Sequence, residues 1–391
     1  MKVVGLMSGT SADGIDAALV DLTGTGADTR IRLLAFDTFP YPPGVQERVL
    51  GAATRPLTVQ TLAHLNVLLG ELFARAAVEV VQHAGLPLEE VALIGSHGQT
   101  VAHAPAPVED TGFTVRATLQ IGEPAIIAER TGITTVADFR VRDQAAGGHG
   151  APLTPFVHFV LFRHPTLHRG VLNLGGIGNL TVIPAGVGLE GVFGFDTGPG
   201  NMLIDGAVVH VTGGKQASDH NGPLARQGHI HARLLDWLLG HPFLALSPPK
   251  TTGREEFGAA YLRRVLTQVR RWQVKRADLV ATLTTFTARA VADQVERFVR
   301  PRVALDELIV AGGGADNLVL MASLQQALPD VKLSRCDDHG LPARALEAVA
   351  FAVLAREAYE GRPNNVPGAT GAARPVLMGK IVPGWHPQGR G

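Results

Sequence analysis

Apolar runs that end in glycine-rich turns recur along the chain and predict a succession of strands and turns. Apolar residues at 3–6 are followed by glycine and polar residues at 7–16 and by an apolar run at 17–20, which is typical of a hairpin. The pattern returns near the middle of the chain, where the apolar run 171–174 precedes a glycine turn and the β-branched run 180–183. The recurrence predicts two related halves.

The segments between and after the hairpins alternate between helical and strand-like patterns. Apolar residues at helical spacing predict a helix over 61–82, a long amphipathic helix over 277–299 and another helix over 344–359. Continuous apolar runs predict strands at 91–94 and at 307–311, and each of these strands runs into glycine. This alternation favours an α/β layer structure.

The size and charge of the chain narrow its class. With 391 residues, of which 46% are hydrophobic and 18% charged, the chain is long enough for two domains, because single cores stop growing at about 250–300 residues. Lys plus Arg equals Asp plus Glu, at 35 each, so no excess of positive charge favours nucleic acid or an anionic membrane surface. We expect neither as a partner.

Cysteine usage and the apolar segments indicate a compartment. Cys336 is the only cysteine of the chain, which excludes an internal disulfide and a cysteine-rich zinc site, as expected in a reducing compartment. The first apolar run is too short for a signal peptide, and no run approaches the ~20 apolar residues that a membrane helix needs. We therefore expect a cytoplasmic protein.

Three glycine-rich turns, each after a strand-like run, are candidate phosphate-binding sites. They lie at 9–14, at 175–178 together with 198–200, and at 312–314. Glycine lets backbone N–H groups approach an anion, but glycine also closes ordinary hairpins, so one such turn alone would indicate little. Three turns with Asp or Asn at their edges favour phosphate binding.

Two common nucleotide-binding motifs are absent or out of context. No G-x-x-x-x-G-K-[ST] sequence occurs, because each Gly-Lys pair is followed by a residue other than Ser or Thr. Residues 186–191 match G-x-G-x-x-G, but they join two strand-like runs and open no helix. We interpret them as a hairpin.

Five motifs stand out by their content and order. They are GTSADGID at 9–16, IGSHGQT at 94–100, VADFRVRD at 136–143, AAGGHGAPL at 145–153 and FDTGPGN at 195–201. Together they resemble the anhydro-N-acetylmuramic acid kinase family of the sugar kinase, Hsp70 and actin superfamily, from Gly5 to about Gly371. The family's late Tyr-Gly-Ile-Pro run reads His-Gly-Leu-Pro at 339–342, which leaves any role of that Tyr without a counterpart.

The resemblance implies an α/β fold of two ribonuclease-H-like lobes, each with a five-stranded sheet, and an active-site cleft between the lobes. The first lobe, 1–168, would hold the first phosphate hairpin and the sugar-binding segments. The second, 169–391, would hold the second phosphate turn and an adenosine turn, and its boundary is inferred from the repeat. The last helix is a candidate to pack back on the first lobe, and the tail from Gly361 reads as extended and partly packed.

The resemblance also implies an activity. ATP, water and 1,6-anhydro-N-acetylmuramate would give N-acetylmuramate 6-phosphate and ADP, in the recycling of cell-wall sugar. The protein would use ATP and Mg²⁺ and would form a homodimer. A kinase of a different sugar and a non-sugar ATPase of the same superfamily are the alternatives, and the sugar-side residues Arg142, Asp143 and Asp196 discriminate against the ATPase.

By resemblance, the three glycine turns bind ATP, and Asp13 or Asp16 holds Mg²⁺ through water, because carboxylate and water ligands suit this ion. The residues assigned to ATP and its phosphates are Gly9, Thr10, Ser11, Ala12, Asp13, Gly14, Ile15, Asp16, Gly175, Gly176, Asn179, Thr197, Gly198, Gly200, Asn201, Gly312, Gly313, Gly314 and Asn317.

Asp196 is the candidate catalytic base, because it matches the family's essential aspartate and precedes a turn suited to face the γ-phosphate. It would deprotonate the water that attacks the anomeric carbon, while O6 takes the phosphoryl group. Without the family context, an aspartate before a turn commonly bonds its own backbone.

Six residues are assigned to the sugar by resemblance: Ser96, His97, Gln99, Arg142, Asp143 and Glu347. The planar guanidinium of Arg142 suits the lactyl carboxylate, although Arg142 and Asp143 would also make an ordinary surface ion pair. His97 is equally suited to form a hydrogen bond with the backbone next to Gly98. For Glu347, the alternative is a place on a solvated helix face.

Two other enzyme classes are disfavoured. Ser96 lies in I-G-S-H-G and not in the G-x-S-x-G elbow of a serine hydrolase. His220, His229 and His231 form a cluster without an H-E-x-x-H helix, so we interpret it as a polar loop and not as a zinc site.

Overall fold

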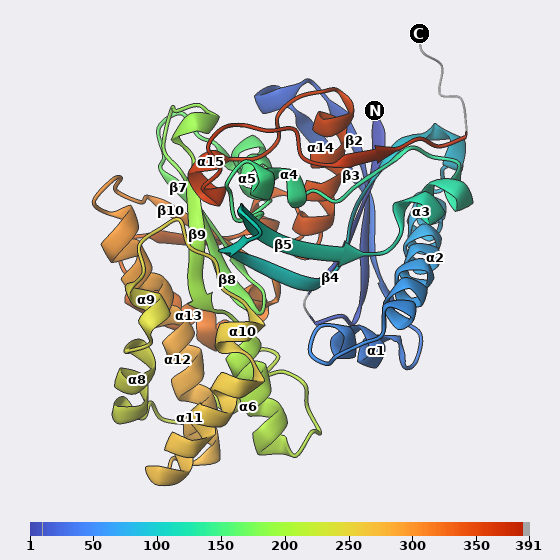
Figure 1. Cartoon of the computed structure of the whole chain (residues 1–391). Coiled ribbons are helices and arrows are strands. Elements are labelled where there is room, and N and C mark those ends of the chain that lie inside the picture. Colours follow the sequence, from blue (N-terminus) through green and yellow to red (C-terminus); the bar gives the residue numbers. More distant parts are fainter. Residues whose placement is uncertain (10, 386–391) are drawn as a thin grey trace. The chain divides into compact units, whose positions relative to one another are not determined.

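The structure is a computed structural model of the chain and describes residues 1–9 and 11–385 (Figure 1). Contacts divide the chain into two units, one of Met1–Leu161 with Arg344–Gly391 and one of Phe162–Ala343. These limits differ from the expected lobes, because the last part of the chain belongs with the first unit.

The first unit contains a seven-stranded sheet in the order β12-β6-β4-β1-β2-β3, with β5 paired to β4. β1 pairs antiparallel with β2 and parallel with β4, while β2 pairs antiparallel with β3 and β4 parallel with β6. The strands are β1 Lys2–Ser8, β2 Gly14–Thr23, β3 Arg30–Pro40, β4 Val91–Asp110, β5 Phe113–Ile121, β6 Thr135–Ala137 and β12 Lys380–Val382.

The second unit contains a five-stranded sheet in the order β11-β10-β7-β8-β9. β7 pairs antiparallel with β8 and parallel with β10, while β8 pairs antiparallel with β9 and β10 parallel with β11. The strands are β7 Arg169–Leu174, β8 Ile177–Ile183, β9 Phe193–Pro199, β10 Glu307–Ala311 and β11 Lys332–Arg335. Five strands of each unit therefore share one order and one set of directions, which confirms the predicted α/β class and the two related halves.

The sheet of the first unit contains the expected five strands and two more, β5 and β12. The predicted strand at 91–94 extends to Asp110, and β5 returns along its second half. The tail supplies β12, which pairs antiparallel with β6. Apolar patterning identifies a strand. Which neighbouring strand it pairs with depends on contacts between segments that are distant in sequence.

Two helices cover opposite faces of the sheet in the first unit. Val4 and Leu6 of β1 belong to the core that helix α2 (Val59–His83) closes, whereas a Cβ on Gly5 between them would overlap the backbone of Ala348 in α14 (Leu346–Tyr359). Alternate residues of a strand point to opposite faces, so α14 lies on the face that α2 leaves. This packing explains why the last helix belongs to the first unit.

The remaining helices are divided between the two units. In the first unit they are α1 Val45–Ala52, α3 Pro124–Thr131, α4 Val141–Ala145 and α15 Pro367–Thr370, with α5 Pro155–Phe162 at the passage to the second unit. In the second unit they are α6 Met202–Thr212, α7 Pro223–Gln227, α8 Ala232–Leu239, α9 Pro242–Ala245, α10 Arg254–Phe257, α11 Ala259–Arg271, α12 Arg276–Gln294 and α13 Leu318–Ala327.

Helix α12 departs from the expected amphipathic helix over 277–299. It ends at Gln294 and continues as a π-helical turn, Val295–Val299, and side chains around its whole circumference are buried. Two of its buried threonines donate within the helix: Thr282 Oγ1 to the Asp278 carbonyl at 2.6 Å and Thr284 Oγ1 to the Val280 carbonyl at 2.9 Å. These internal bonds let polar residues lie in the core.

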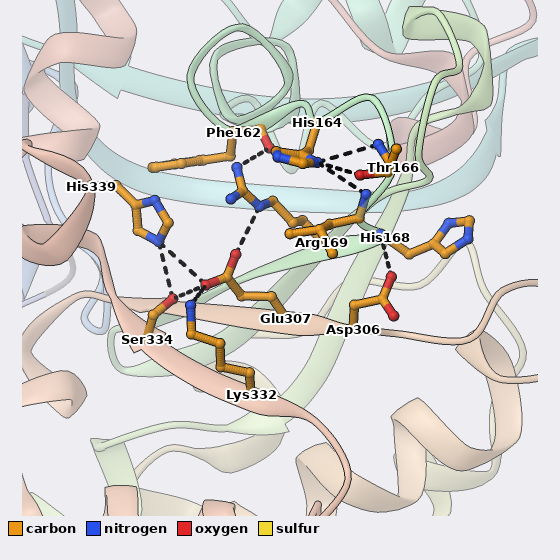
Figure 2. Close-up of polar contacts among 11 residues, drawn as sticks. Phe162, His164, Thr166, His168, Arg169, Asp306, Glu307, Lys332, Ser334 and His339 are labelled. Carbon is orange, nitrogen blue, oxygen red and sulfur yellow. Dashed lines mark hydrogen bonds and ion pairs between the residues drawn. The ribbon is translucent and has the colours of Figure 1, made fainter.

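A buried carboxylate joins the parallel strands of the second sheet at their amino ends (Figure 2). Glu307 accepts from Arg169 Nε at 2.8 Å, from Lys332 Nζ at 2.9 Å and from Ser334 Oγ at 3.1 Å. Burial raises the pKa of Glu307, but hydrogen bonds and the charges of Lys332 and Arg169 outweigh burial, so the pKa lies below the ordinary 4.5. The contacts span β7, β10 and β11.

Candidate active site

The turn between β1 and β2 is held in place by side chains around it. Ser8 Oγ lies 2.7 Å from both the Gly14 carbonyl oxygen and Gln99 Oε1, and Gln99 Nε2 donates to the Gly9 carbonyl at 3.2 Å. Gln99, assigned to the sugar by resemblance, therefore supports the turn that was assigned to phosphate. Thr10 lies outside the described residues.

Two carboxylates lie within and just after this turn. Ser11 Oγ donates to Asp13 Oδ1 at 2.7 Å, and Thr38 Oγ1 donates to Asp16 Oδ1 at 2.6 Å. Burial and the neighbouring charge of Asp13 raise the pKa of Asp16 above the ordinary 3.8, against the Thr38 bond. Two interacting carboxylates are the oxygen donors that a hard divalent cation takes.

Other residues of the turn serve the backbone. Ala12 has a φ of 51° and its N–H donates to the Gly9 carbonyl at 3.2 Å, so the chain turns there in the left-handed region. The side chain of Ile15 is 2% exposed and belongs to the core. Any contact of Ile15 with a nucleotide therefore comes from its backbone.

Ser96 and His97 are neighbours in β4, so their side chains point to opposite faces of the sheet. The His97 ring is buried and bonded on both sides: Nδ1 lies 2.9 Å from the Gly98 carbonyl, and Nε2 accepts from Arg140 Nε at 3.1 Å. Burial and the charge of Arg140 hold the pKa of His97 well below 6.5. His97 is thus a neutral ring that positions Arg140.

Arg142 and Asp143, both in α4, have different environments. Arg142 is exposed, and its one close polar contact given by the structure is 3.4 Å from Nη1 to the Leu377 carbonyl. Asp143 is fully buried, and it accepts from Thr370 Oγ1 at 2.7 Å and from the Gly150 N–H at 2.9 Å. The Asp143 carboxylate therefore holds the segment around Gly150 together, and the two residues, both described, do not form the ion pair that was the alternative to sugar binding.

Glu347 lies in the first turn of α14 and is half-buried. Its position at the start of this helix, beside the strands that carry the first turn, differs from the fully solvated helix face considered from sequence.

The two glycine turns of the second unit that were expected to act together are bonded to each other. The Gly200 N–H donates to the Gly176 carbonyl at 2.9 Å, and the Asn201 N–H donates to the Gly175 carbonyl at 2.8 Å. A Cβ on Gly200 would overlap the Gly175 carbonyl oxygen, so only glycine permits this approach. Thr197 Oγ1 adds a bond to the Gly178 carbonyl at 3.1 Å.

The third glycine turn joins the same edge. Gly312 has a φ of 77°, and a Cβ there would overlap the side chain of Asn173 at the end of β7. Gly313 is open toward Asn201, whose Nδ2 lies 3.9 Å from a Cβ built on it. Because β7 and β10 are parallel neighbours, their carboxyl ends bring the second and third turns together. Gly314 packs on Leu174, and Asn317 caps α13 by accepting from the Leu320 N–H at 3.1 Å.

Asp196 lies in β9, 7% exposed, and accepts three hydrogen bonds. Asn179 Nδ2 donates to Oδ1 at 2.7 Å, while Thr251 Oγ1 and the Thr252 N–H each donate to Oδ2 at 2.8 Å. Burial raises the pKa of Asp196 above the ordinary 3.8, and these donors, which favour the ionised form, only partly offset burial. Asp196 is therefore a fixed carboxylate with increased basicity.

Residues 250–252 were not predicted from sequence. The Asp196 N–H donates to the Lys250 carbonyl at 3.0 Å, so backbone and side chain of Asp196 are both held by this loop. The Lys250 ammonium donates to the Phe243 carbonyl at 3.2 Å, and burial and Arg297 lower its pKa to about 8. The sequence marks this loop only by a Lys-Thr-Thr run after two prolines, which does not indicate a contact with Asp196.

The described residues contain no group of three or more His, Cys, Asp or Glu side chains suited to a metal ion. In the described part, His231 instead caps α8, accepting from the Leu234 N–H at 3.2 Å. Among the helices of residues 1–9 and 11–385, none has the length and apolar character to span a membrane.

The sequence matches the profile of a family described as anhydro-N-acetylmuramic acid kinase over residues 1–384. An anhydro-N-acetylmuramic acid kinase from Caldanaerobacter subterraneus subsp. tengcongensis is 50% identical over 380 residues, which cover 97% of this chain and 96% of that protein. One from Bacillus cereus strain B4264 is 43% identical over 385 residues, which cover 98% and 97%.

Solved structures resemble the chain more distantly. Component A of (R)-2-hydroxyglutaryl-CoA dehydratase from Acidaminococcus fermentans has a TM-score of 0.44 and 14% identity, covering 91% of this chain and 98% of that one. A ROK family glucokinase from Streptomyces griseus, in complex with glucose and AMPPNP, has a TM-score of 0.40 and 15% identity, covering 91% and 100%.

Proposed function

Because the chain belongs to the anhydro-N-acetylmuramic acid kinase family, we propose how its residues share the work of that kinase reaction. In this reaction, 1,6-anhydro-N-acetylmuramate, ATP and water give N-acetylmuramate 6-phosphate and ADP, a step of cell-wall sugar recycling. Water adds to the anomeric carbon, the C1–O6 bond breaks, and O6 takes the γ-phosphoryl group.

Asp196 is the general base in this proposal. The environment of Asp196 supports this role. Its carboxylate is buried, three hydrogen-bond donors orient it, and its pKa lies above that of an ordinary aspartate. The three donors favour the ionised form needed to accept a proton from water, and burial keeps that form basic. The proton of the attacking water passes to Asp196 as the C1–O bond forms.

The glycine turns supply the phosphate contacts. Phosphoryl transfer needs positioning and charge neutralisation, and N–H groups in glycine turns such as 175–178 and 312–314 are suited to both, while turn 198–200 supports the first of these turns. The backbone bonds between turns 175–178 and 198–200 fix these two turns before a nucleotide arrives. Binding energy is then not spent on ordering them.

Mg²⁺ fits Asp13 and Asp16. The two carboxylates interact, and the pKa of Asp16 is raised partly by Asp13, so a cation would relieve their repulsion. A bound Mg²⁺ would neutralise charge on the phosphates of ATP. A cytoplasmic location, where ATP is found, and a homodimer complete the proposal and rest on the family alone.

The test of the base compares Asp196→Asn with the wild type by following ADP and phosphorylated sugar with mass spectrometry. The variant keeps the shape and loses the proton acceptor, so sugar phosphorylation is expected to fall about 10²–10⁴-fold. Asp236→Asn, at an exposed position of α8, is the matched control and should retain full activity. Undiminished turnover by Asp196→Asn would remove Asp196 from this role.

A further inference from the structure

The loop that holds Asp196 is itself fixed by a buried side chain. Residues 246–253 join α9 to α10 without a helix or strand of their own (Figure 1). Residues 250–252 of this loop make three contacts with Asp196, two to its carboxylate and one to its backbone N–H. A loop orients a carboxylate only as firmly as the loop itself is held, so the anchor of this loop affects how well Asp196 is placed.

Lys250 provides this anchor from inside the second unit. It is 5% exposed, and its Nζ donates to the Phe243 carbonyl at 3.2 Å. The same Nζ lies 4.7 Å from the centre of the Phe243 ring and 5.1 Å from the centre of the Phe298 ring. Both distances suit the attraction between an ammonium and an aromatic face, which is stronger where water is excluded. The side chain therefore ties the loop to α9 and to the π-helical turn Val295–Val299.

Helix α9, on which the ammonium rests, is fixed at its carboxyl end. Arg297 Nη1 and Gln294 Nε2 donate to the Leu244 carbonyl at 2.9 Å and 3.1 Å, beside the Phe243 carbonyl that Lys250 takes. The last carbonyls of a helix have no partner within the helix, so side-chain donors at this end hold it in place. Lys250 thus rests on a support that the end of α12 and the turn after it keep rigid.

Burial and neighbouring charges set the protonation of Lys250. Burial and the charge of Arg297 disfavour the ammonium, whereas Asp293 and Asp196 favour it, and the pKa of Lys250 falls to about 8. Helix α9 contributes no charged side chain of its own. Lys250 is therefore an ammonium at neutral pH and becomes an amine in mild alkali, where its attraction to the two rings weakens.

We propose that Lys250 is a positioning residue for Asp196: its ammonium, held between the rings of Phe243 and Phe298, fixes the loop whose donors orient the carboxylate. The proposal rests on the proposed function, in which Asp196 is the general base. Lys250 acts through the loop and takes no part in the chemical steps. Loss of the ammonium should loosen the loop donors, which misplaces the carboxylate and raises the pKa of Asp196.

The test is a double-mutant cycle of Lys250→Met and Asp196→Asn, with ADP and phosphorylated sugar followed by mass spectrometry. Lys250→Met keeps the length of the side chain and removes its charge. Alone, it should lower kcat about 10–100-fold with little change in the KM for ATP. In the Asp196→Asn background it should cost less than about twofold, because the base that it positions is gone. Lys332→Met, the same change at an exposed residue of β11, is the control and should change kcat little in either background.

The pH profile separates positioning from a merely structural role. Wild-type kcat/KM should fall above about pH 8 as Lys250 loses its proton, whereas Lys250→Met has no such proton to lose and should stay level there. Stability should move the other way. Burial depresses the folded-state pKa, so the unfolded chain binds more protons between about pH 8 and 10.4, and wild type should gain stability relative to Lys250→Met as pH rises from 7 to 9 in denaturation experiments.

Two results would overturn the positioning role. An equal loss of activity from Lys250→Met with and without Asp196→Asn would show that Lys250 does not act through Asp196. An alkaline limb retained in Lys250→Met would show that another group titrates there. If Lys250→Met does not fold, Phe298→Leu, which removes one ring and keeps the lysine, enters the same cycle with the same expectation. A wild type that forms no phosphorylated sugar, or an Asp196→Asn variant with full activity, would overturn the proposed function instead.

Discussion

Asp196 illustrates how a single carboxylate is tuned by opposing effects. Burial raises its pKa, and bonds from Asn179, Thr252 and Thr251 lower it, leaving the pKa above 3.8. A general base must be ionised to act, so activity is lost as pH falls through this raised pKa. The acid limb of the kcat/KM profile should therefore lie above the range of an ordinary aspartate.

Removing one donor should move that limb in a defined direction. Thr251→Val deletes the 2.8 Å hydrogen bond to Asp196 Oδ2. Loss of this donor disfavours the ionised carboxylate and raises the pKa of Asp196, so the acid limb should shift upward by about one pH unit. The measurement is kcat/KM against pH, with Thr267→Val as control because its exposed hydroxyl bonds only the Arg263 carbonyl within its own helix. A limb that stays in place would show that Thr251 does not tune Asp196.

Sequence motifs predicted some residues of the candidate site and missed the residues that hold them in place. Asp196 was predicted from its motif, because a family signature is local. Thr251 lies 55 positions away and contacts Asp196 only because the chain returns to β9, so no local pattern indicates it. Asp143 was predicted for the sugar, but its partners Asn365 and Thr370 come from the distant tail.

At the scale of elements, close approach of α14 to the first sheet depends on glycines in β1 and β4. A Cβ on Gly95 would overlap the Phe351 carbonyl oxygen. Gly95→Ala should therefore lower the free energy of unfolding by about 1–3 kcal/mol or more, as overpacking does. Chemical denaturation measures it, and Gly51→Ala, with open space around its Cβ, should leave stability unchanged or higher. Equal effects of the two changes would contradict the packing described.

The contacts of Glu307 join β7, β10 and β11, so we expect this residue to contribute to the stability of the second sheet. Glu307→Gln removes the charge that faces Arg169 and Lys332, and should cost about 2–4 kcal/mol of unfolding free energy. Because the folded-state pKa is depressed, the stabilisation is present above pH 4.5 and is lost as pH falls below it. The wild-type advantage, followed by denaturation between pH 7 and pH 3, should shrink toward acid.

An exposed pair provides the comparison for Glu307. Asp330→Asn breaks an ion pair with Arg300 at the surface and should cost at most ~1 kcal/mol. If the advantage of Glu307 persisted unchanged at pH 3, the ion pairs would not be its source.

Helices and strands with a strong local pattern of apolar residues were predicted well, whereas the strands at the edges of the first sheet were not. The hairpins and the strand Glu307–Ala311 follow from apolar runs and glycine punctuation. The length of β4, the strand β5 and the strand β12 depend on pairing between distant segments.

At the scale of the whole molecule, the chain leaves the first unit once and returns to it. The second unit, Phe162–Ala343, has a complete five-stranded sheet and its own core. Expressed alone, residues 162–343 should fold and unfold cooperatively in a denaturant titration. Residues 1–161 alone should not, because without α14 one face of their sheet is uncovered. Independent folding of 1–161 would contradict this division.

In the proposed reaction, one bound arrangement serves both addition of water and phosphoryl transfer. The most direct test is a brief reaction of the protein with Mg²⁺, ATP and 1,6-anhydro-N-acetylmuramate in ¹⁸O-water, with the label located by mass spectrometry before the anomeric hydroxyl exchanges. We expect one ¹⁸O on the anomeric carbon of the 6-phosphorylated sugar and none in its phosphate. Label in released phosphate, with the sugar unchanged, would mean that water attacks ATP and not the anomeric carbon, and would contradict the proposed reaction.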